Sequence, residues 1–380
     1  MPHDILIIGG GPAGISTALH LARFAPELVP RTLVLEKAHY PRPKLCAGGL
    51  VADAEVMLQR LGLDVSDIPH MDADAAHFDF EGRGLTFRIP GSHAIRMIRR
   101  EDFDAWLAAK ACERGVSIAE GVTVRNVLPS SSGVIVETDR GDYHAMVVVG
   151  ADGSNGVVRR CILPDVSMYT ARVIEVVVPS KENDDHGEKD AFFDFLPIPT
   201  GIAGYTWDFP TRVNGRLMRC WGICDCYVRS IDSHPPLKDL LKKEMARHGY
   251  DLGDYRLHSH PIRLFSPFGA FAVPHVILVG DTAGTDPIFG EGISIALGYG
   301  HIAAQALKSA FGNQDFLFRD YKRRILFSPL GRALLCRTVI SRILYLNHWP
   351  WFQKLVWRHL KVLTRFVGNK LVLNWARRMS

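Results

Sequence analysis

The sequence predicts an α/β (α+β) fold, and three observations point to it. A β-α-β unit opens the chain: residues 4–9 form a short apolar strand, residues 12–24 have helical spacing, and residues 32–36 (TLVLE) form a second strand. Residues 170–230 alternate β-rich runs with turns, so we expect a second sheet there. Beyond residue 314 the pattern is mostly helical. At 380 residues the chain suits two interleaved subdomains better than one simple core.

Further elements are expected between and after these segments. A helix over residues 100–114 has Phe103, Trp106 and Leu107 on one face. The polar run over residues 180–190 predicts an exposed loop. The remaining expected elements are strands over residues 93–99, 123–128, 133–138, 143–149 and 275–279, and a long helix over residues 290–310.

A glycine-rich turn joins the first strand to the first helix. Gly9-x-Gly11-x-x-Gly14 has the spacing of a dinucleotide site: the first glycine permits the tight turn, the second lets the backbone approach a pyrophosphate, and the third packs helix on strand. The phosphates would meet the helix N-terminus. Glu36 ends the second strand, where an acid can bind a ribose 2′-hydroxyl. Strand, helix and acid together predict dinucleotide binding.

Two later segments favour FAD over NAD. VVVGADGSNGVVR places the turn Asp152-Gly153 between a strand and a helix start, and VILVGDTAGTDPIFGEG does the same with Gly280-Asp281. With the glycine-rich turn, these segments resemble the FAD-dependent oxidoreductases related to aromatic hydroxylases. The resemblance implies that Asp281 binds ribityl hydroxyls and that the following helix N-terminus faces the flavin, where its dipole would stabilise the reduced ring. It also implies that Arg100 contacts the cofactor.

Two further stretches resemble the geranylgeranyl reductase family. PRPKLCAGGL is similar to that family's cysteine-bearing loop, and PIPTGIAGYTWDFP carries its Tyr-x-Trp-x-Phe-Pro pattern as Tyr205, Trp207, Phe209 and Pro210. The resemblance spans residues 4–300. It implies a Rossmann-type FAD-binding domain interleaved with a β-sheet substrate domain and followed by a helical C-terminal region. It also implies reduction of isolated alkenes in geranylgeranyl chains, with hydride from the flavin N5 and a proton from elsewhere.

The cysteine of the first stretch is a candidate proton source. The resemblance implies that Cys46 lies beside the isoalloxazine ring, where it would deliver a proton or tune the flavin. We expect Lys44 and Arg42 to lower the pKa of this thiol, because nearby cations favour the thiolate. A small packing residue is the alternative role for Cys46. Tyr205 and Trp207 alternate along a strand and could wall an apolar cavity suited to a polyprenyl chain, although such a strand is also ordinary core packing.

These inferences define the expected site and the expected division of the chain. Cys46, Tyr205 and Trp207 are expected to act in catalysis. The residues expected to contact FAD are Gly9, Gly11, Ala13, Gly14, Glu36, Lys37, Lys44, Cys46, Ala47, Gly48, Gly49, Arg100, Val124, Asp152, Gly153, Gly280, Asp281, Pro287, Gly290, Gly292 and Ile293. The FAD-binding domain is expected to comprise residues 1–75, 101–165 and 266–315, the substrate domain residues 76–100 and 166–265, and a basic, Trp-rich helical region residues 316–380. No metal is predicted, because the pair Cys224-x-Cys226 lacks the usual zinc spacing.

Charge is distributed unevenly along the chain. Residues 321–380 contain 13 Lys and Arg and no Asp or Glu, whereas the whole chain carries a net charge of only +5. Such a basic segment on an acidic body predicts an anionic partner surface. Its four tryptophans, interleaved with Leu and Arg, allow two compatible interpretations: helices that lie in a membrane interface, or a helical cap that packs on the body. Its longest uncharged run has 11 residues, fewer than the ~20 needed to span a bilayer.

Cysteine usage and the opening residues predict the compartment. Seven scattered cysteines, an odd number, and an apolar strand almost directly after Met1 favour reduced thiols in a cytoplasmic setting. We expect peripheral contact with the cytoplasmic face of the membrane through the C-terminal region. The expected partners are a polyprenyl or lipid-like substrate and an electron donor, either NAD(P)H or ferredoxin, but no nucleic acid. There is no second well-placed GxGxxG, so a dedicated NADPH domain is not predicted.

The predicted function is an FAD-dependent reductase that saturates C=C bonds of a geranylgeranyl or polyprenyl group on a lipid, chlorophyll-type or quinone substrate. One alternative is a flavin-dependent monooxygenase that hydroxylates or epoxidises an apolar substrate. Another is a prenyl-binding escort protein of the same architecture. The family usually has small residues after the start of the helix expected over residues 290–310, and this chain departs from that pattern with Gly298-Tyr299-Gly300.

Overall fold

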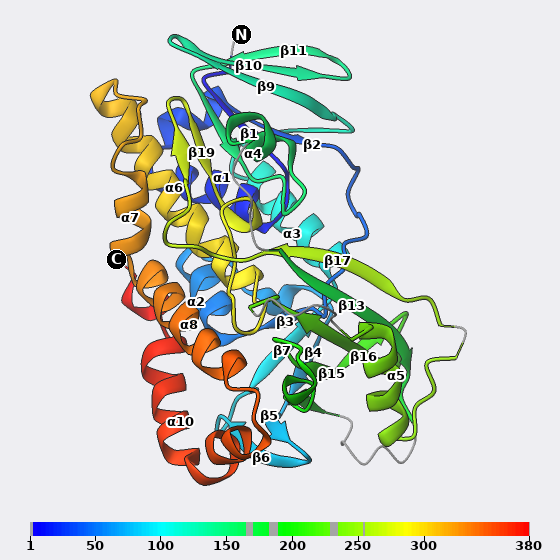
Figure 1. Cartoon of the computed structure of the whole chain (residues 1–380). Coiled ribbons are helices and arrows are strands. Elements are labelled where there is room, and N and C mark those ends of the chain that lie inside the picture. Colours follow the sequence, from blue (N-terminus) through cyan, green and yellow to red (C-terminus); the bar gives the residue numbers. More distant parts are fainter. Residues whose placement is uncertain (1–2, 165–169, 182–188, 229–234, 254, 380) are drawn as a thin grey trace.

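Two sheet-based layers and a helical C-terminal region make up the molecule. The computed structural model describes residues 3–164, 170–181, 189–228, 235–253 and 255–379. In Figure 1 a mostly parallel sheet and its helices occupy the upper part, a large, mostly antiparallel sheet lies at the lower right, and the C-terminal helices run down the left side. The predicted mixed α/β architecture is confirmed.

The upper sheet is parallel apart from one edge strand. Its central strands are continuous apolar runs with every residue buried, as expected where helices and other layers cover both faces. Across the sheet the order is β18 (Ala272–Val273), β19 (Val276–Leu278), β12 (Val147–Gly150), β1 (Ile5–Ile8), β2 (Thr32–Glu36) and β8 (Ser117–Glu120), with β18 antiparallel to β19.

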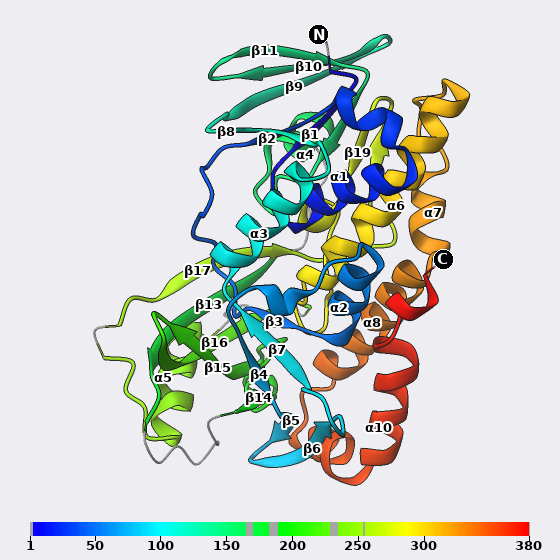
Figure 2. The same cartoon turned by 180° about the vertical axis from the view of Figure 1, so that it is seen from behind.

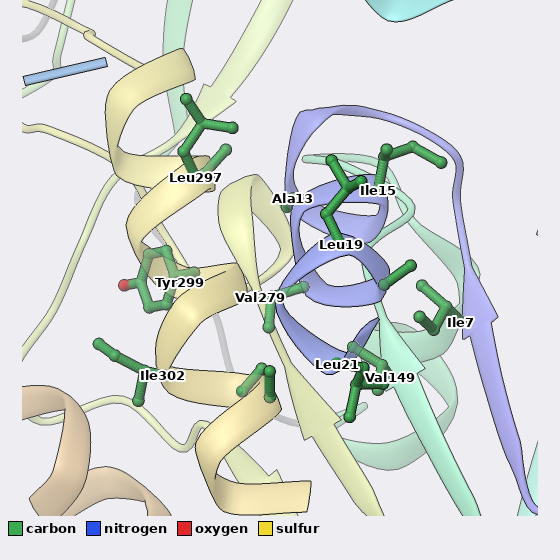
Figure 3. Packing of buried hydrophobic residues seen from close by; sticks show 14 of the residues in the cluster. Ile7, Ala13, Ile15, Leu19, Leu21, Val149, Val279, Leu297, Tyr299 and Ile302 are labelled. Atoms are coloured by element: carbon green, nitrogen blue, oxygen red, sulfur yellow. The ribbon is translucent and has the colours of Figure 1, made fainter. Parts of the chain in front are cut away.

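Two helices cover one face of this sheet and pack against each other. α1 (Pro12–Phe24) and α6 (Ile293–Asn313) place Ile15, Leu19 and Leu297 in one cluster with strand residues (Figure 3). The Ser16 hydroxyl of α1 donates to the carbonyl of Leu297 at 2.9 Å. A Cβ at Gly300 would lie 2.4 Å from Ser16 Oγ, so the two helices approach this closely only because that position is glycine. The predicted helix over residues 12–24 is confirmed; α6 begins three residues later than predicted.

Three more helices and a small antiparallel sheet complete this part. The helices are α2 (Ala52–Arg60), α3 (Arg100–Cys112) and α4 (Val157–Ile162), and the antiparallel strands are β9 (Val124–Ser130), β10 (Gly133–Thr138) and β11 (Gly141–Ala145). The single run predicted over residues 143–149 divides into β11 and β12. The chain changes sheets at Met146, because β11 pairs with β10 whereas β12 joins the parallel sheet. Periodicity cannot reveal such a division.

The lower sheet has seven strands and two different faces. One face is covered by α5 (Leu237–Arg247), where Leu241 packs with Val176 and Trp221. The order is β17 (His258–Arg263), β13 (Thr170–Pro179), β16 (Arg216–Asp225), β15 (Thr206–Val213), β14 (Asp190–Asp194), β5 (Ala75–Phe80) and β6 (Arg83–Arg88). The predicted second sheet is confirmed. Most of the loop expected over residues 180–190 lies outside the described residues.

A short three-stranded sheet lies between the two layers (Figure 2). It consists of β3 (Gly49–Leu50), β7 (Ile95–Ile98) and β4 (His70–Ala73). It brings the loop that precedes β3 beside the strand that leads into α3. The division of the chain into alternating FAD-binding and substrate segments stays a prediction.

The C-terminal region packs on the body through several helices. They are α7 (Tyr321–Phe327), α8 (Pro329–Leu346), α9 (Pro350–Lys354) and α10 (Lys361–Val367), joined by tight turns. The Asp53 carboxylate of α2 accepts from the backbone N–H groups of Asn374 at 2.9 Å and Ala376 at 2.8 Å. Trp357 and Trp375 are buried, which confirms the helical-cap interpretation for their side of the region. No helix among the described residues is both long and apolar enough to cross a bilayer.

This packing explains why position 298, in the segment Gly298-Tyr299-Gly300, is a glycine. A Cβ at Gly298 would lie 2.6 Å from the ring of Trp375, so this ring packs directly against the α6 backbone. Gly298→Ala should therefore destabilise the protein by about 1–3 kcal/mol through overpacking. Gly312→Ala is the matched control in the same helix, since nothing lies within 4 Å of its Cβ, and it should be neutral or stabilising by up to about 1 kcal/mol. Urea unfolding of both variants measures the difference; equal effects would contradict this explanation.

Candidate active site

One large cavity runs from the N-terminus of α1 to the C-terminal region. Its volume is about 1360 Å³, more than a drug-sized ligand needs. At one end it is lined by the glycine-rich turn and β2, in the middle by the Cys46 loop and the cavity face of the seven-stranded sheet, and at the far end by α8, α10 and the turns next to them. The cavity is therefore built from all three parts of the fold.

The glycine-rich turn fits a dinucleotide phosphate. Gly9 has φ of 107°, in the region that favours glycine. A Cβ at Gly11 would meet only Arg42 Nη2, at 3.7 Å, so this glycine faces open cavity at the start of α1. α1 has no side-chain N-cap and no acid in its first turn, which leaves its first N–H groups available to an anion such as a phosphate.

Glu36 is held at the edge of the same end. Its carboxylate accepts from the backbone N–H of Gly10 at 2.9 Å and that of Ala38 at 3.0 Å. It lines the cavity at the carboxyl end of β2, the place predicted for a ribose contact. Together with the glycine turn, this donor and acceptor set fits the adenosine diphosphate half of FAD.

Arg100 belongs to a buried charge cluster beside this end. Its guanidinium makes two hydrogen bonds with Asp104, at 2.8 and 2.9 Å, and Asp104 also pairs with Arg42 at 3.1 Å. Arg42 reaches Glu36 at 3.5 Å. The cluster joins α3 and the Cys46 loop to the dinucleotide end, and it fixes the Arg100 side chain where it lines the cavity.

The two aspartate-glycine turns are bonded to each other. The Asp152 carboxylate accepts from the Val158 N–H at 3.0 Å and from the Thr282 hydroxyl at 3.3 Å, so it caps α4 and links the second motif to the third. Burial raises the pKa of Asp152. Asp281 lines the cavity next to Gly292, and its contact with the ribityl chain stays a prediction.

The Cys46 loop passes close to β7 and holds the thiol in the cavity. Gly48 has φ of 80°, and a Cβ there would lie 2.0 Å from the carbonyl oxygen of Ile98, so only glycine fits. Cys46 Sγ accepts from the Gly48 N–H at 3.4 Å. The sulfur is accessible from within the cavity and is otherwise enclosed by protein.

The expectation that Lys44 and Arg42 lower the pKa of the Cys46 thiol is wrong. Burial raises the pKa of the Cys46 thiol, and the nearby Arg100 guanidinium opposes this only in part. Enclosure therefore outweighs the cations that the sequence shows next to Cys46. The thiol keeps its proton at neutral pH.

Two titratable groups beside Cys46 were missed by sequence reasoning. Glu175 of β13 is buried in the cavity wall, and burial raises its pKa to about 7. His260 of β17 lies 3.3 Å from Lys44 Nζ. Burial, and after it the Lys44 ammonium, lowers the pKa of His260 to about 4, so the neutral ring accepts from Lys44.

Aromatic side chains form the wall beyond the thiol. Tyr205, Trp207 and Phe209 all line the cavity, which confirms that they share one face of the chain. The Tyr205 hydroxyl donates to the carbonyl of Phe289. Trp357 of the C-terminal region stacks on Phe195, the residue directly after β14, with ring centroids 4.1 Å apart. The C-terminal region is therefore part of the cavity wall.

Most of the predicted site residues meet at this cavity. Gly14, Gly280 and Pro287 do not line it: the first two lie where packing requires glycine, and Pro287 is buried behind the lining. A Cβ added at Gly14 would lie 2.0 Å from the carbonyl oxygen of Gly9, and a Cβ added at Gly280 would lie 2.6 Å from the Ala13 Cβ. The lining residues that sequence reasoning did not select include Glu175, His260, Phe193, Phe289, Trp357 and Val372.

Two glycines of the first motif should respond differently to alanine. Gly11→Ala places a methyl in open cavity, so the stability of the apoprotein should be unchanged while the Kd for FAD rises about tenfold or more. Gly14→Ala forces the methyl against the Gly9 carbonyl and should cost about 1–3 kcal/mol of stability. Flavin fluorescence titration and urea unfolding separate the two effects. A Gly11→Ala protein that binds FAD normally would show that the phosphates lie elsewhere.

Known proteins are similar to this chain over most of its length. A curated digeranylgeranylglycerophospholipid reductase of Thermoplasma acidophilum is 29% identical over 348 residues, covering 85% of this chain and 83% of its own. A menaquinone reductase of Mycolicibacterium smegmatis is 26% identical over 327 residues, covering 80% and 76%. Among solved structures, a geranylgeranyl bacteriochlorophyll reductase-like protein from Thermoplasma acidophilum has a TM-score of 0.80 at 22% identity, covering 97% of this chain and 96% of its own.

Flavin-dependent halogenating enzymes share the fold at lower similarity. A flavin-dependent brominase has a TM-score of 0.71 at 20% identity, covering 98% of this chain and 95% of its own. The reductase names of the relatives confirm the family resemblance predicted from the sequence. The FAD binding domain family model matches residues 3–227, more than half of the chain. The chain therefore belongs to the FAD binding domain family and is an FAD-dependent oxidoreductase.

Proposed function

We propose that this protein is a reductase that saturates C=C bonds of a polyprenyl group. The observation that carries the proposal is the continuity of the cavity, which leads from the dinucleotide glycines past Cys46 into a chamber walled by Trp207, Phe289 and Trp357. When bound, reduced FAD supplies hydride. A long hydrocarbon chain offers only apolar contact, which is what this chamber provides.

The chain's own residues supply the remaining requirements. Cys46 retains its proton at neutral pH and is the candidate proton donor to the alkene. Tyr205 is fixed by its bond to Phe289, and Trp207 stands beside it as the rigid wall. Arg100, Glu36 and the glycine turn hold the cofactor. The head group proposed for the substrate is a lipid, chlorophyll-type or quinone group, since relatives are named reductases of digeranylgeranylglycerophospholipid, geranylgeranyl diphosphate and menaquinone.

Product mass with and without oxygen tests this function against a monooxygenase. The purified holoprotein is supplied with NADPH or with reduced ferredoxin, the two proposed electron donors, and a geranylgeranyl lipid. A reductase gives products heavier by two hydrogens per double bond in both atmospheres. A product that gains oxygen, formed only in air, would replace the proposal with the monooxygenase. Protein that purifies without flavin would instead favour an escort role.

The C-terminal region is proposed to dock on an anionic membrane surface. Exposed apolar side chains gather there, among them Trp349, Trp351, Val362, Leu363, Phe366 and Leu371, next to Lys361, Arg365 and Lys370. α10 lies at the outer edge of the molecule (Figures 1 and 2). Its Val362 is 86% exposed, whereas Thr364 and Val367 of the same helix line the cavity. A lipid chain would thus enter the cavity from the membrane.

Flotation with phosphatidylglycerol vesicles tests this docking surface. The wild type should float with the vesicles, and Val362→Glu combined with Phe366→Glu should stay behind. Phe268→Glu is the matched control, because Phe268 is 87% exposed but lies outside the C-terminal region. Equal flotation of all three proteins would contradict the proposal.

A further inference from the structure

Glu175 is a buried acid in an apolar strand, and none of the residues that the structure describes forms an ion pair with it. It occupies the middle of β13, TARVIEVVVP, and is only 5% exposed. An unpaired carboxylate at such depth is costly, so its retention in the cavity wall calls for a chemical role.

The strand register places Glu175 in a row of residues on the cavity face of the sheet. It lies opposite His258 on β17 and opposite Gly222 on β16, and Gly222 in turn lies opposite Trp207 on β15. Directly paired residues share a face. A Cβ at Gly222 would lie 2.0 Å from the Trp207 ring, so the indole covers this glycine and forms the wall beside Glu175. His258, at the edge strand, is exposed to solvent.

The carboxylate lies near the Cys46 segment, and both residues line the cavity. The backbone amide of Cys46 opposes, in part, the effect of burial on the pKa of Glu175, and the charge of Glu175 in turn raises the pKa of the Cys46 thiol. The other charged or titratable groups that face this pair are Arg100 from α3, Lys44 from the same loop, His260 from β17, Cys220 from β16 and Asp281. Burial raises the pKa of Glu175 to about 7, so this carboxyl gains and loses a proton near neutrality.

We propose that Glu175 returns the proton that Cys46 gives to the alkene. The inference rests on the proposed reductase function. One alkene carbon takes a hydride, with its two electrons, from the reduced flavin, and the other takes the proton of Cys46 as the S–H bond breaks and a C–H bond forms. The thiolate then takes the proton of the Glu175 carboxyl, and Glu175 recovers one from solvent at the His258 edge. Neither side chain is oxidised or reduced. Glu175 thus acts through Cys46, as a positioning and proton-supplying residue.

The rate at which iodoacetamide alkylates Cys46 in the holoprotein, measured by peptide mass as pH is varied, reports the fraction of thiolate. This measurement needs no substrate. Glu175→Gln keeps the size of the side chain and one carbonyl oxygen but removes the charge. Its Cys46 alkylation profile should move to lower pH by about one unit, a tenfold faster reaction at a fixed pH below the midpoint. Glu175→Asp should restore most of the wild-type profile. Asp194→Asn is the matched control: Asp194 lies on the same sheet, burial raises its pKa to about 7, and it does not line the cavity. Exposed Cys112 is the internal reference thiol.

Turnover supplies the second readout. In Glu175→Gln, single-turnover saturation by the pre-reduced protein should persist, while steady-state turnover should fall about tenfold or more because the thiolate is not reprotonated. An unchanged alkylation profile, or unchanged steady-state turnover, would overturn the inference. If the wild type saturates no alkene, the proposed function fails instead, and the alkylation profile shows whether the two residues are still coupled.

Discussion

Cys46→Ala is expected to slow alkene saturation about 100-fold or more while FAD stays bound. The thiol is a protonated group in the cavity lining, and the methyl of alanine cannot give a proton. The loop should keep its path, because the close approach of Gly48 to the Ile98 carbonyl is unaffected by the substitution. Single-turnover rates of flavin reoxidation, with flavin content measured by absorbance, give the comparison.

Two other substitutions make this result specific. Cys46→Ser should recover part of the rate, since a hydroxyl is a weaker acid than the thiol but can relay a proton. Cys112→Ala should have the wild-type rate, because Cys112 is an exposed thiol at the end of α3 outside the cavity lining. A Cys46→Ala protein that saturates its substrate at full rate with flavin bound would remove the thiol from the mechanism.

Arg337→Met is expected to destabilise the protein by about 3–5 kcal/mol. Arg337 of α8 is fully buried and pairs with Asp286 at 2.9 Å and Glu291 at 2.8 Å, both in the segment that leads to α6. It also donates to the carbonyl of Val372 at 2.7 Å. Methionine fills the volume but leaves two carboxylates without a counter-charge. Urea unfolding measures the loss. The control is Arg332→Met: Arg332 is an exposed arginine of the same helix that donates to the Phe327 carbonyl, and its replacement should cost less than about 1 kcal/mol.

The cost of Arg337→Met should depend on pH. Burial raises the pKa of Asp286 to about 6, although Arg337 opposes the shift. A carboxyl whose folded pKa lies above its unfolded value favours folding at low pH and loses that contribution as pH rises through the folded pKa. Without Arg337 the folded pKa rises further, so the variant should approach the wild type in stability at about pH 5 and differ most at about pH 8. A pH-independent difference would show that the pair contributes packing rather than charge.

Local signals allowed the dinucleotide end to be predicted closely. The glycine turn, Pro12 at the first helical position and the apolar run of β1 are read from adjacent residues, and the predicted helix over residues 12–24 has the observed bounds. Tyr205 and Trp207 were placed correctly because alternation along one strand fixes their common face.

The remainder of the site depends on pairing between distant segments. Glu175 is an isolated acid in an apolar strand, and only the fold brings it to Cys46, so no local pattern marks it. The same holds for Arg337, whose partners lie in the segment before α6. The wrong direction for the Cys46 pKa has a related cause: a sequence shows the neighbouring cations but not the burial that outweighs them.

The cavity should bring a polyprenyl alkene to the flavin, and anaerobic mixing of chemically reduced holoprotein with one equivalent of a geranylgeranyl lipid tests this while flavin absorbance is followed. We expect the flavin to reoxidise without oxygen and the lipid to gain two hydrogens for each flavin oxidised. A flavin that stays reduced until oxygen enters would rule out the reductase.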